Sequence, residues 1–298
     1  MLSHRLKVAV PLIAVAVLAL TLPGLSGQLL FALLALGFLG GSIYESFELS
    51  KAGCPGVMRY RGSVMGFGAA LLAAAWLSAS RCDNWIAANL FMDTAIALAM
   101  MLCSFGILFQ HKPDQEALNA FGRACFNALF YCWMLVFLVK IYFLPGGHGP
   151  LFLGFLVCIT KLGDIGAYFA GSTAGARLKG GSHKLAPLIS PKKSWEGLAG
   201  GFLFSMAGAV VFRCFAGERL AAECMGRSFS LGYLDVLSLG ALAASVGLLG
   251  DLLESVVKRA ASAKDSGNIP GLGGVLDIVD SLVPMGMLCY LWVLLKLI

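Results

Sequence analysis

From Val8 to Tyr44 the sequence reads VAVPLIAVAVLALTLPGLSGQLLFALLALGFLGGSIY, without one charged residue. A helix needs roughly 20 apolar residues to cross the hydrocarbon core of a bilayer. Pro23, Gly24 and Gly27 interrupt the run near its middle. The run therefore predicts two membrane-spanning helices joined by a tight turn.

The first of these two segments has a second interpretation. Arg5 and Lys7 followed by an apolar run also suit a secretory signal peptide. However, no clear small-x-small cleavage site follows, and the second apolar segment begins at once. We therefore expect the first segment to be retained as a membrane span.

The composition of the whole chain agrees with a membrane protein. Of its 298 residues, 59% are hydrophobic and only 13% are charged, and the mean hydropathy is +0.84. A soluble domain of this size needs many more charges to cover its surface. The composition also excludes a disordered chain, collagen, a coiled coil and a disulfide scaffold. The nine cysteines form no C-x-x-C pair, so we interpret them as small buried residues.

Seven further apolar segments bring the prediction to about nine transmembrane helices in an all-α, polytopic fold. With a cytoplasmic N-terminus, 16 of the 22 lysines and arginines lie on the cytoplasmic side. The positive-inside rule therefore predicts an N-in, C-out orientation, with the polar motifs facing the cytoplasm. The net charge of +6 fits this orientation and anionic lipid, and no basic tract is dense enough to indicate nucleic acid. The seven segments cover residues 62–80, 86–109, 124–144, 150–171, 197–216, 231–250 and 275–295.

The two halves of the chain differ in kind, and no internal repeat is visible. Residues 1–150 are apolar segments with short, plain loops, whereas residues 151–298 contain nearly all of the patterned polarity. We expect one membrane unit, in which 1–150 form an N-terminal transmembrane scaffold. Residues 151–298 then form a C-terminal functional half with its polar motifs at the cytoplasmic edge.

The first polar cluster lies inside the predicted span 150–171. Lys161, Asp164 and Tyr168 are spaced so that they share one helical face. Charged residues within a span are costly and usually face each other or a polar cavity. The spacing alone leaves two interpretations open, a structural Lys161–Asp164 pair and a functional site.

The second polar cluster is the basic loop His183–Gly197, which precedes the predicted span 197–216. Lysines bind phosphates as point charges, and Ser194 is placed to cap the next helix, whose free N–H groups would then face an anion. A juxtamembrane loop that sets topology and contacts lipid headgroups is the alternative. That alternative explains the lysines but not the compact order Ser-Pro-Lys-Lys-Ser-Trp-Glu-Gly of residues 190–197, so we favour phosphate binding.

The third polar cluster, from Gly250 to Ser281, brings carboxylates to the predicted membrane edge. Mg²⁺ takes carboxylate oxygens together with water and substrate phosphates, so the cluster predicts a Mg²⁺–phosphate site. A helical hairpin of paired charges is the alternative, but apolar packing would not place so many carboxylates at this depth. The cluster contains a helical stripe (Asp251, Glu254, Ser255, Lys258, Arg259), a turn (Lys264, Asp265) and a shared helical face (Asp277, Asp280).

Between residues 160 and 285 these motifs resemble, in family order, the phosphatidate cytidylyltransferase (CDP-diacylglycerol synthase) family. The N-terminal half is similar only in consisting of apolar spans. The resemblance implies that CTP and phosphatidic acid react to give CDP-diacylglycerol and pyrophosphate, with Mg²⁺ and a second metal ion. The matching runs are Asp164-x-x-Ala167-Tyr168-x-x-Gly171, His183-Lys184-Leu185-Ala186-Pro187-x-x-Ser190-Pro191-Lys192-Lys193-Ser194-Trp195-Glu196-Gly197, Gly250-Asp251-Leu252-x-Glu254-Ser255-x-x-Lys258-Arg259, Lys264-Asp265-x-Gly267 and Pro270-Gly271-x-Gly273-Gly274-x-x-Asp277-x-x-Asp280.

The resemblance also implies roles for individual residues. The expected metal ligands are Asp251, Asp277 and Asp280. The expected catalytic residues are Asp251, Asp277, Lys258, Arg259, Lys264 and Asp265. The residues expected to bind the nucleotide and its phosphates are Lys184, Ser190, Lys192, Lys193, Ser194, Glu196 and Asp164.

Two positions and one turn depart from the family pattern. Leu272 stands where the family usually has His, Ile278 stands where it usually has Arg, and the turn after Lys264-Asp265 is one residue shorter than in the family. Ser194 stands where Thr is commoner, which keeps the hydroxyl. These changes affect any acid–base or phosphate role of the first two positions, but they leave the carboxylates in place. We therefore expect a variant subfamily that is still active.

The reaction implied is an in-line attack of the lipid phosphate on the α-phosphorus of CTP, in phospholipid biosynthesis. An alternative is a CTP-dependent kinase of polyprenol or another lipid. A membrane transporter is less favoured, because it predicts broken helices and charges in both halves. We expect the chain in a bacterial inner membrane among membrane lipids, with homodimer formation as an open option.

Overall fold

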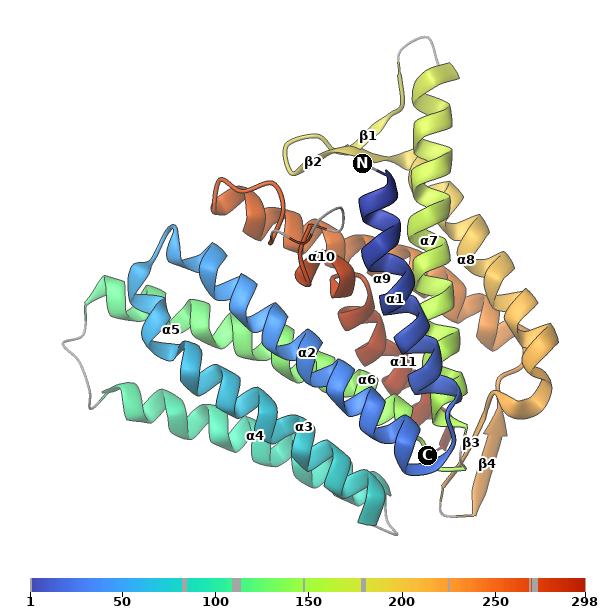
Figure 1. The fold of residues 1–298 in the computed structure, drawn as a ribbon, viewed down its shortest axis with the longest axis horizontal. Coiled ribbons are helices and arrows are strands. Elements are labelled where there is room, and N and C mark those ends of the chain that lie inside the picture. The colour runs from blue at the N-terminus through green and yellow to red at the C-terminus, as the bar shows by residue number, and fades with distance from the viewer. Residues whose placement is uncertain are drawn as a thin grey trace.

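The computed structural model describes residues 2–81, 85–108, 114–146, 148–177, 181–224, 226–267, 269 and 273–297. These residues are mostly helical, as predicted, and the long helices pack side by side (Figure 1). The helices are α1 (Leu2–Thr21), α2 (Gly24–Lys51), α3 (Arg61–Arg81), α4 (Trp85–Leu108), α5 (Gln115–Asn127), α6 (Met134–Tyr142), α7 (Gly149–Arg177), α8 (Trp195–Ala216), α9 (Tyr233–Ala260), α10 (Leu276–Val279) and α11 (Leu282–Leu297). Shorter turns are η1 (Pro55–Tyr60), the π-helical η2 (Ala128–Trp133), which joins α5 to α6, and η3 (Gly217–Arg219).

Two small β-hairpins interrupt the helical fold, and the sequence does not predict them. β1 (Lys184–Ala186) pairs with β2 (Ser190–Ser194), and β3 (Ala221–Cys224) pairs with β4 (Arg227–Ser230), both antiparallel. The hairpins lie at opposite ends of the molecule (Figure 1). Their strands are short and lack the alternating apolar pattern by which strands are usually predicted, so they were expected as loops.

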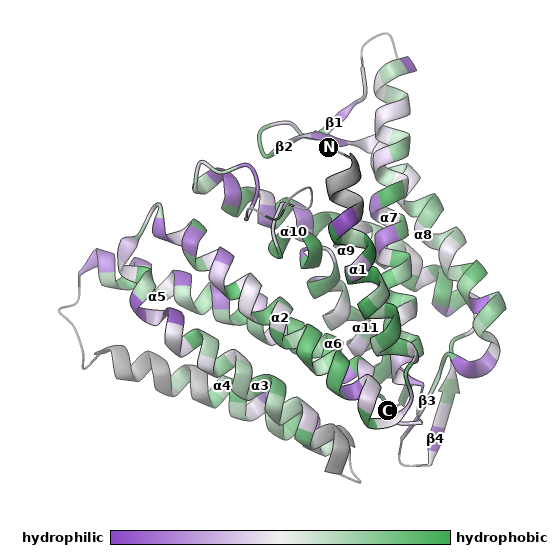
Figure 2. Cartoon of the chain, viewed as in Figure 1, coloured by the Kyte–Doolittle hydropathy of each residue, from purple (hydrophilic) through white to green (hydrophobic). Residues whose placement is uncertain are grey.

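Six helical segments are long and apolar enough to cross a membrane. Figure 2 shows hydrophobic residues along the length of these helices and hydrophilic residues gathered toward several of their ends. Large apolar side chains such as Phe215 (82% exposed) and Leu234 (81%) point outward, as they would toward lipid. The chain is therefore a multi-pass helical membrane protein. The six segments are Gly24–Lys51, Gln115–Tyr142, Gly149–Arg177, Trp195–Arg219, Tyr233–Ala260 and Leu276–Leu297, and shorter apolar helices cover Lys7–Thr21 and Ala87–Leu98.

Helices α7, α8 and α9 pack against one another and form the frame of the polar region, with α11 against α6, α7 and α9. Glycines allow the closest of these approaches. A Cβ atom on Gly166 of α7 would lie 2.5 Å from the carbonyl oxygen of Gly200 on α8, and the reverse distance is 2.6 Å. Membrane helices gain little from hydrophobic association, so this close backbone packing contributes directly to their stability.

The contact between Gly166 and Gly200 gives a first prediction. The Gly200→Ala substitution should destabilise the fold by about 1–3 kcal/mol, because the added methyl group must push α7 and α8 apart. Gly37→Ala on α2 is the matched control, since a Cβ atom there meets nothing within 4 Å. The thermal midpoint in detergent should fall for Gly200→Ala only. Equal midpoints for the two variants would contradict the packing described here.

Candidate active site

The β1–β2 hairpin is held against the start of α8 by two side chains. The hydroxyl of Ser194 accepts a hydrogen bond from the Gly197 backbone N–H (3.1 Å), which confirms the predicted helix cap. The carboxylate of Glu196 accepts hydrogen bonds from the His183 backbone N–H (3.1 Å to each oxygen) and lies 2.5 Å from the His183 ring Nδ1. Ser194 and Glu196 together fix where the basic strand β2 lies.

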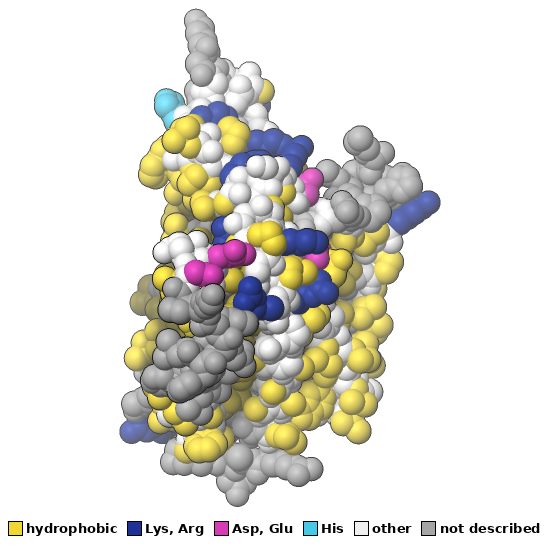
Figure 3. All heavy atoms as spheres, turned by 90° about the vertical axis from the view of Figure 1, so that its left-hand side faces the viewer, with side chains coloured by type: hydrophobic (Ala, Val, Ile, Leu, Met, Phe, Trp, Pro, Cys, Tyr) yellow, Lys and Arg dark blue, Asp and Glu magenta, His cyan; other side chains and the backbone are white. Residues whose placement is uncertain are grey.

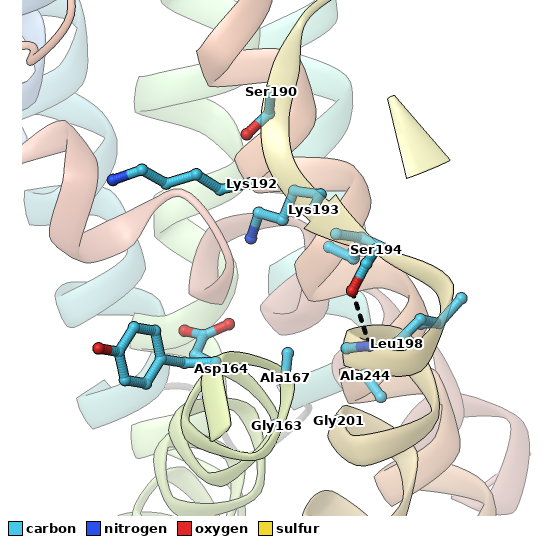
Figure 4. Close-up of a pocket in the computed structure, with 13 residues that line it drawn as sticks. Gly163, Asp164, Ala167, Ser190, Lys192, Lys193, Ser194, Leu198, Gly201 and Ala244 are labelled. Atoms are coloured by element: carbon cyan, nitrogen blue, oxygen red, sulfur yellow. Dashed lines mark hydrogen bonds between the residues drawn. The ribbon is translucent and has the colours of Figure 1, made fainter. Parts of the chain in front are cut away.

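A cavity of about 260 Å³ lies under β2, between α7, α8 and α9 (Figure 4). Ser190, Lys192 and Lys193 line it from the strand, and Asp164 lines it from α7. In Figure 4 the Lys193 amine and the Asp164 carboxylate point toward the same space. Small residues such as Gly163 and others on α8 and α9 leave the space open. The cavity thus combines free volume with cationic and hydroxyl groups, which suits a phosphate-containing ligand.

A group of three carboxylates lies beside this cavity. Asp251 and Glu254 belong to α9, and Asp280 lies at the break between α10 and α11. Each offers one oxygen, and these oxygens lie within 4.8 Å of one another. Glu254 is only 1% exposed, and its Oε1 has no hydrogen-bond partner among the described residues. A buried, unpartnered carboxylate oxygen next to two further carboxylates fits a divalent cation such as Mg²⁺.

Two lysines balance part of the negative charge. Lys193 of β2 forms an ion pair with Asp251, so the same lysine borders the cavity and the carboxylate group. Lys258 of α9, which is 7% exposed, pairs with Glu254 (3.1 Å) and with Asp277 (2.5 Å). Lys193 therefore connects the cavity to the carboxylate group.

The charged residues of α7 connect to the same site. Lys161 lies 3.2 Å from Asp164 and donates a hydrogen bond to the Ser281 hydroxyl (2.9 Å). That hydroxyl donates to Asp164 (3.1 Å), and the Ser281 backbone N–H donates to Asp280 (2.6 Å). The structural Lys161–Asp164 pair thus exists, and Asp164 also lines the cavity with Tyr168. The two interpretations left open by the sequence are compatible.

Several residues expected at the site belong neither to the group of three carboxylates nor to the lining of the cavity. Asp277 is not one of the three grouped carboxylates, and its Oδ2 accepts hydrogen bonds from the Ser266 N–H (3.1 Å) and hydroxyl (2.9 Å). The Arg259 Nε donates to the carbonyl oxygen of Ile189 in the hairpin turn (3.4 Å). Lys184, Lys264 and Asp265 are exposed to solvent, and Lys184 donates a hydrogen bond to the Ser182 hydroxyl. Glu196 closes the hairpin through His183.

Figure 3 shows that most of the charged side chains on the face it presents gather in its upper part, above a largely apolar area. Of the two positions that depart from the family pattern, Leu272 lies outside the described residues. Ile278 is partly buried in α10, between Asp277 and Asp280. It places an apolar side chain where the family usually has an arginine.

Three residues take part in the site beyond those expected. Glu254 was visible as part of the helical stripe, three residues after Asp251, but it was not expected as a ligand. Ser281 follows Asp280 directly. Glu45 of α2 accepts a hydrogen bond from Ser266 (2.8 Å), and its only sequence signal is its place directly after the charge-free run that ends at Tyr44.

The fold and the site together define a multi-pass helical membrane protein in which buried carboxylates adjoin a basic cavity. The family model described as "Cytidylyltransferase family" matches residues 3–296. The chain therefore belongs to the cytidylyltransferase family.

Individual relatives agree with this membership. The chain is 32% identical over 227 residues to the phosphatidate cytidylyltransferase of Staphylococcus haemolyticus, covering 74% of the chain and 75% of the relative. It is 41% identical over 151 residues to that of Haemophilus influenzae (49% and 48%) and 30% identical over 191 residues to that of Bacillus subtilis (64% and 63%). The matched region thus spans about half to three quarters of these relatives.

The contacts of Glu196 give a second prediction. The Glu196→Ala substitution should loosen the β1–β2 hairpin, because the backbone N–H and the ring of His183 lose their acceptor. Trypsin should then cleave faster after Lys184 and Lys193. The matched control is Glu223→Ala, which changes an exposed carboxylate in strand β3. Unchanged cleavage combined with a raised KM for CTP would instead place Glu196 at the nucleotide.

Proposed function

We propose that this chain is a phosphatidate cytidylyltransferase, which converts CTP and phosphatidic acid into CDP-diacylglycerol and pyrophosphate. The observation that carries the proposal is the Lys193–Asp251 pair, which joins a basic cavity to a buried group of carboxylates. Such a site suits the joining of two phosphate compounds, one soluble and one embedded in the bilayer. Membership of the cytidylyltransferase family and the names of the relatives support this chemistry.

The cavity is the proposed binding site of the CTP phosphates. Lys192 and Lys193 supply positive charge, and the hydroxyls of Ser190 and Ser194 supply hydrogen bonds. The capped start of α8 directs backbone N–H groups and the positive end of the helix dipole to the same region. These features stabilise the charge of a polyphosphate without requiring a basic side chain for every oxygen.

The carboxylate group is the proposed Mg²⁺ site, with Asp251, Glu254 and Asp280 as ligands. Asp277, which Lys258 connects to Glu254, remains a predicted ligand, and a second metal ion remains part of the proposal. Bound Mg²⁺ would offset phosphate charge and hold phosphate oxygens in position. Removal of the ion would leave the Glu254 oxygen buried without a partner, which is costly.

In the proposed reaction, an oxygen of the lipid phosphate attacks the α-phosphorus of CTP in line with the leaving pyrophosphate. One P–O bond forms to the lipid phosphate, and the bond between the α-phosphorus and its bridging oxygen breaks. A phosphate monoester is already an anionic nucleophile, so no strong general base is required. Positioning and charge stabilisation then supply most of the catalysis. Lys193 and Lys258 would offset the charge of the two substrates, as Arg259 and Lys264 would from the rim.

The proposed orientation has nine spans, with the N-terminus and the site on the cytoplasmic side. The six apolar segments would be joined by α1, α3 and α4, which form helices where spans are predicted. Two kinds of observation support the orientation. With this arrangement of spans, most lysines and arginines fall on the cytoplasmic side. In Figure 1, α1 begins and α11 ends at opposite ends of the molecule, and the β1–β2 hairpin lies at the end where α1 begins.

The remaining expectations are part of the same proposal. Residues 1–150 would act as the scaffold and 151–298 as the catalytic half, in a bacterial inner membrane, as the bacterial relatives suggest. CTP would reach the site from the cytoplasm, while the acyl chains of phosphatidic acid stay in the bilayer.

The proposed reaction leads to a third prediction. Purified protein with labelled CTP, phosphatidic acid and Mg²⁺ should form a CDP-lipid and release pyrophosphate in equal amounts. Chromatography of the lipid fraction and a pyrophosphate assay measure the two products. Release of CDP with a phosphorylated lipid would instead identify a CTP-dependent lipid kinase. Absence of both products in folded protein would contradict the proposed function.

The carboxylate group leads to a fourth prediction. Asp251→Asn should lower kcat by about a hundredfold or more, because the site loses charge that stabilises the reacting phosphates. The same variant should bind Mn²⁺ more weakly, as measured by electron paramagnetic resonance. Glu218→Gln, an exposed carboxylate in η3, is the control and should match the wild type. Wild-type turnover and Mn²⁺ affinity in folded Asp251→Asn would refute the metal site.

A further inference from the structure

Glu45 is a carboxylate of the N-terminal half that contacts residues 266–276 near the C-terminus. Its side chain on α2 is buried, with the residue 8% exposed. Oε1 accepts a hydrogen bond from the Val275 backbone N–H (2.8 Å), and Oε2 accepts from the Leu276 N–H (3.0 Å) and the Ser266 hydroxyl (2.8 Å). No lysine or arginine of the described chain pairs with Glu45. These neutral donors therefore satisfy a buried charge, as in other charge-assisted hydrogen bonds.

Two glycines near the C-terminus, Gly267 and Gly274, leave room for this carboxylate. A Cβ atom on Gly267 or on Gly274 would overlap with the Glu45 side chain. On α2 itself, a Cβ atom on Gly41 would lie 2.7 Å from the side chain of Val275. The close approach of α2 to residues 266–276 thus depends on small residues on both sides. Side-chain size at these positions is limited by Glu45 and its neighbours.

A continuous chain of polar contacts joins Glu45 to the carboxylate group. The Ser266 hydroxyl lies between Glu45 (2.8 Å) and Asp277 (2.9 Å). Asp277 contacts Lys258 (2.5 Å), and Lys258 contacts Glu254 (3.1 Å). Glu254 is one of the three grouped carboxylates. The Ser266 hydroxyl has one hydrogen, which it can donate to either carboxylate, and the remaining links are ion pairs between the side chains of described residues.

We infer that Glu45 is a positioning residue for the active site. By binding the backbone at Val275 and Leu276, it fixes the start of α10 and therefore the placement of Asp277 and Asp280, which follow on the same short segment. The inference rests on the proposed function in so far as these carboxylates serve the reaction. The N-terminal half, which was predicted from the sequence only as a scaffold, would thus contribute a residue that positions the carboxylates of the site.

The test compares Glu45→Gln with Glu48→Gln in the full-length protein. Glu48 lies one turn further along α2, is partly exposed and pairs with Lys51 and Arg61, away from the site. Gln keeps the shape of the side chain but turns an NH₂ group toward the N–H and hydroxyl donors of residues 266–276. The variants are compared by thermal midpoint, by kcat and KM for CTP, and by Mn²⁺ affinity from electron paramagnetic resonance.

Glu45→Gln should lower kcat and Mn²⁺ affinity by about tenfold each, as is typical when a group that orients metal ligands is changed, with little change in KM for CTP. Glu48→Gln should match the wild type. A lower thermal midpoint with unchanged kcat and Mn²⁺ affinity would show a purely structural role and overturn the inference.

If Glu45→Gln does not fold, Glu45→Asp is the second variant. It keeps the charge but shortens the side chain by one methylene, which withdraws the carboxylate from the Val275 and Leu276 N–H groups, so it should also lower kcat and Mn²⁺ affinity. Wild-type values in folded Glu45→Asp would overturn the inference. The Mn²⁺ measurement does not depend on turnover. A wild-type protein that binds Mn²⁺ but makes no CDP-lipid would therefore refute the proposed function, and the Glu45 inference would still be tested by Mn²⁺ affinity.

Discussion

The close approach of Asp251, Glu254 and Asp280 at the edge of an apolar helical bundle is the constraint on which the polar half of the structure depends. Moving a carboxylate out of water costs several kcal/mol even after relaxation, and three neighbouring carboxylates also repel one another. Lys193 and Lys258 offset part of this cost. A buried oxygen of Glu254 still has no partner among the described residues, and a bound cation would satisfy it. The arrangement is costly for folding alone, and the proposed metal site would account for it.

The surrounding helices hold this group in place by close packing and by short polar links. Gly166 and Gly200 let α7 and α8 meet at the backbone, which places Asp164 beneath strand β2. From the other side, Glu45 secures the segment that leads to Asp280. The same arrangement separates two environments, because the cavity lies among polar groups while the outer helical faces are apolar. In the proposed reaction, a soluble nucleotide would approach from water and a membrane lipid from the bilayer.

Much of this was predictable from the sequence, and the remainder has physical reasons. Charge-free runs indicate membrane helices, because the bilayer demands them: of the two spans predicted from Val8–Tyr44, α2 is long and apolar enough to cross, and α1 forms a shorter apolar helix. The helix cap by Ser194 is a local interaction, and it was predicted correctly. The β1–β2 hairpin was missed because its pairing depends on Glu196 and His183 rather than on an apolar pattern. Glu45 was missed because its partners lie more than 200 residues away along the chain.

The grouping of Glu254 with Asp251 and Asp280 likewise depends on how α9 meets the segment after α10, which local spacing does not determine. The central claim is that the carboxylate group and the cavity under β2 form one site. A structure of the protein with Mn²⁺ and a non-hydrolysable CTP analogue tests it most directly. The account predicts anomalous signal among Asp251, Glu254 and Asp280, with the nucleotide phosphates beside Lys193. Metal bound away from these carboxylates, or a nucleotide outside the cavity, would contradict it.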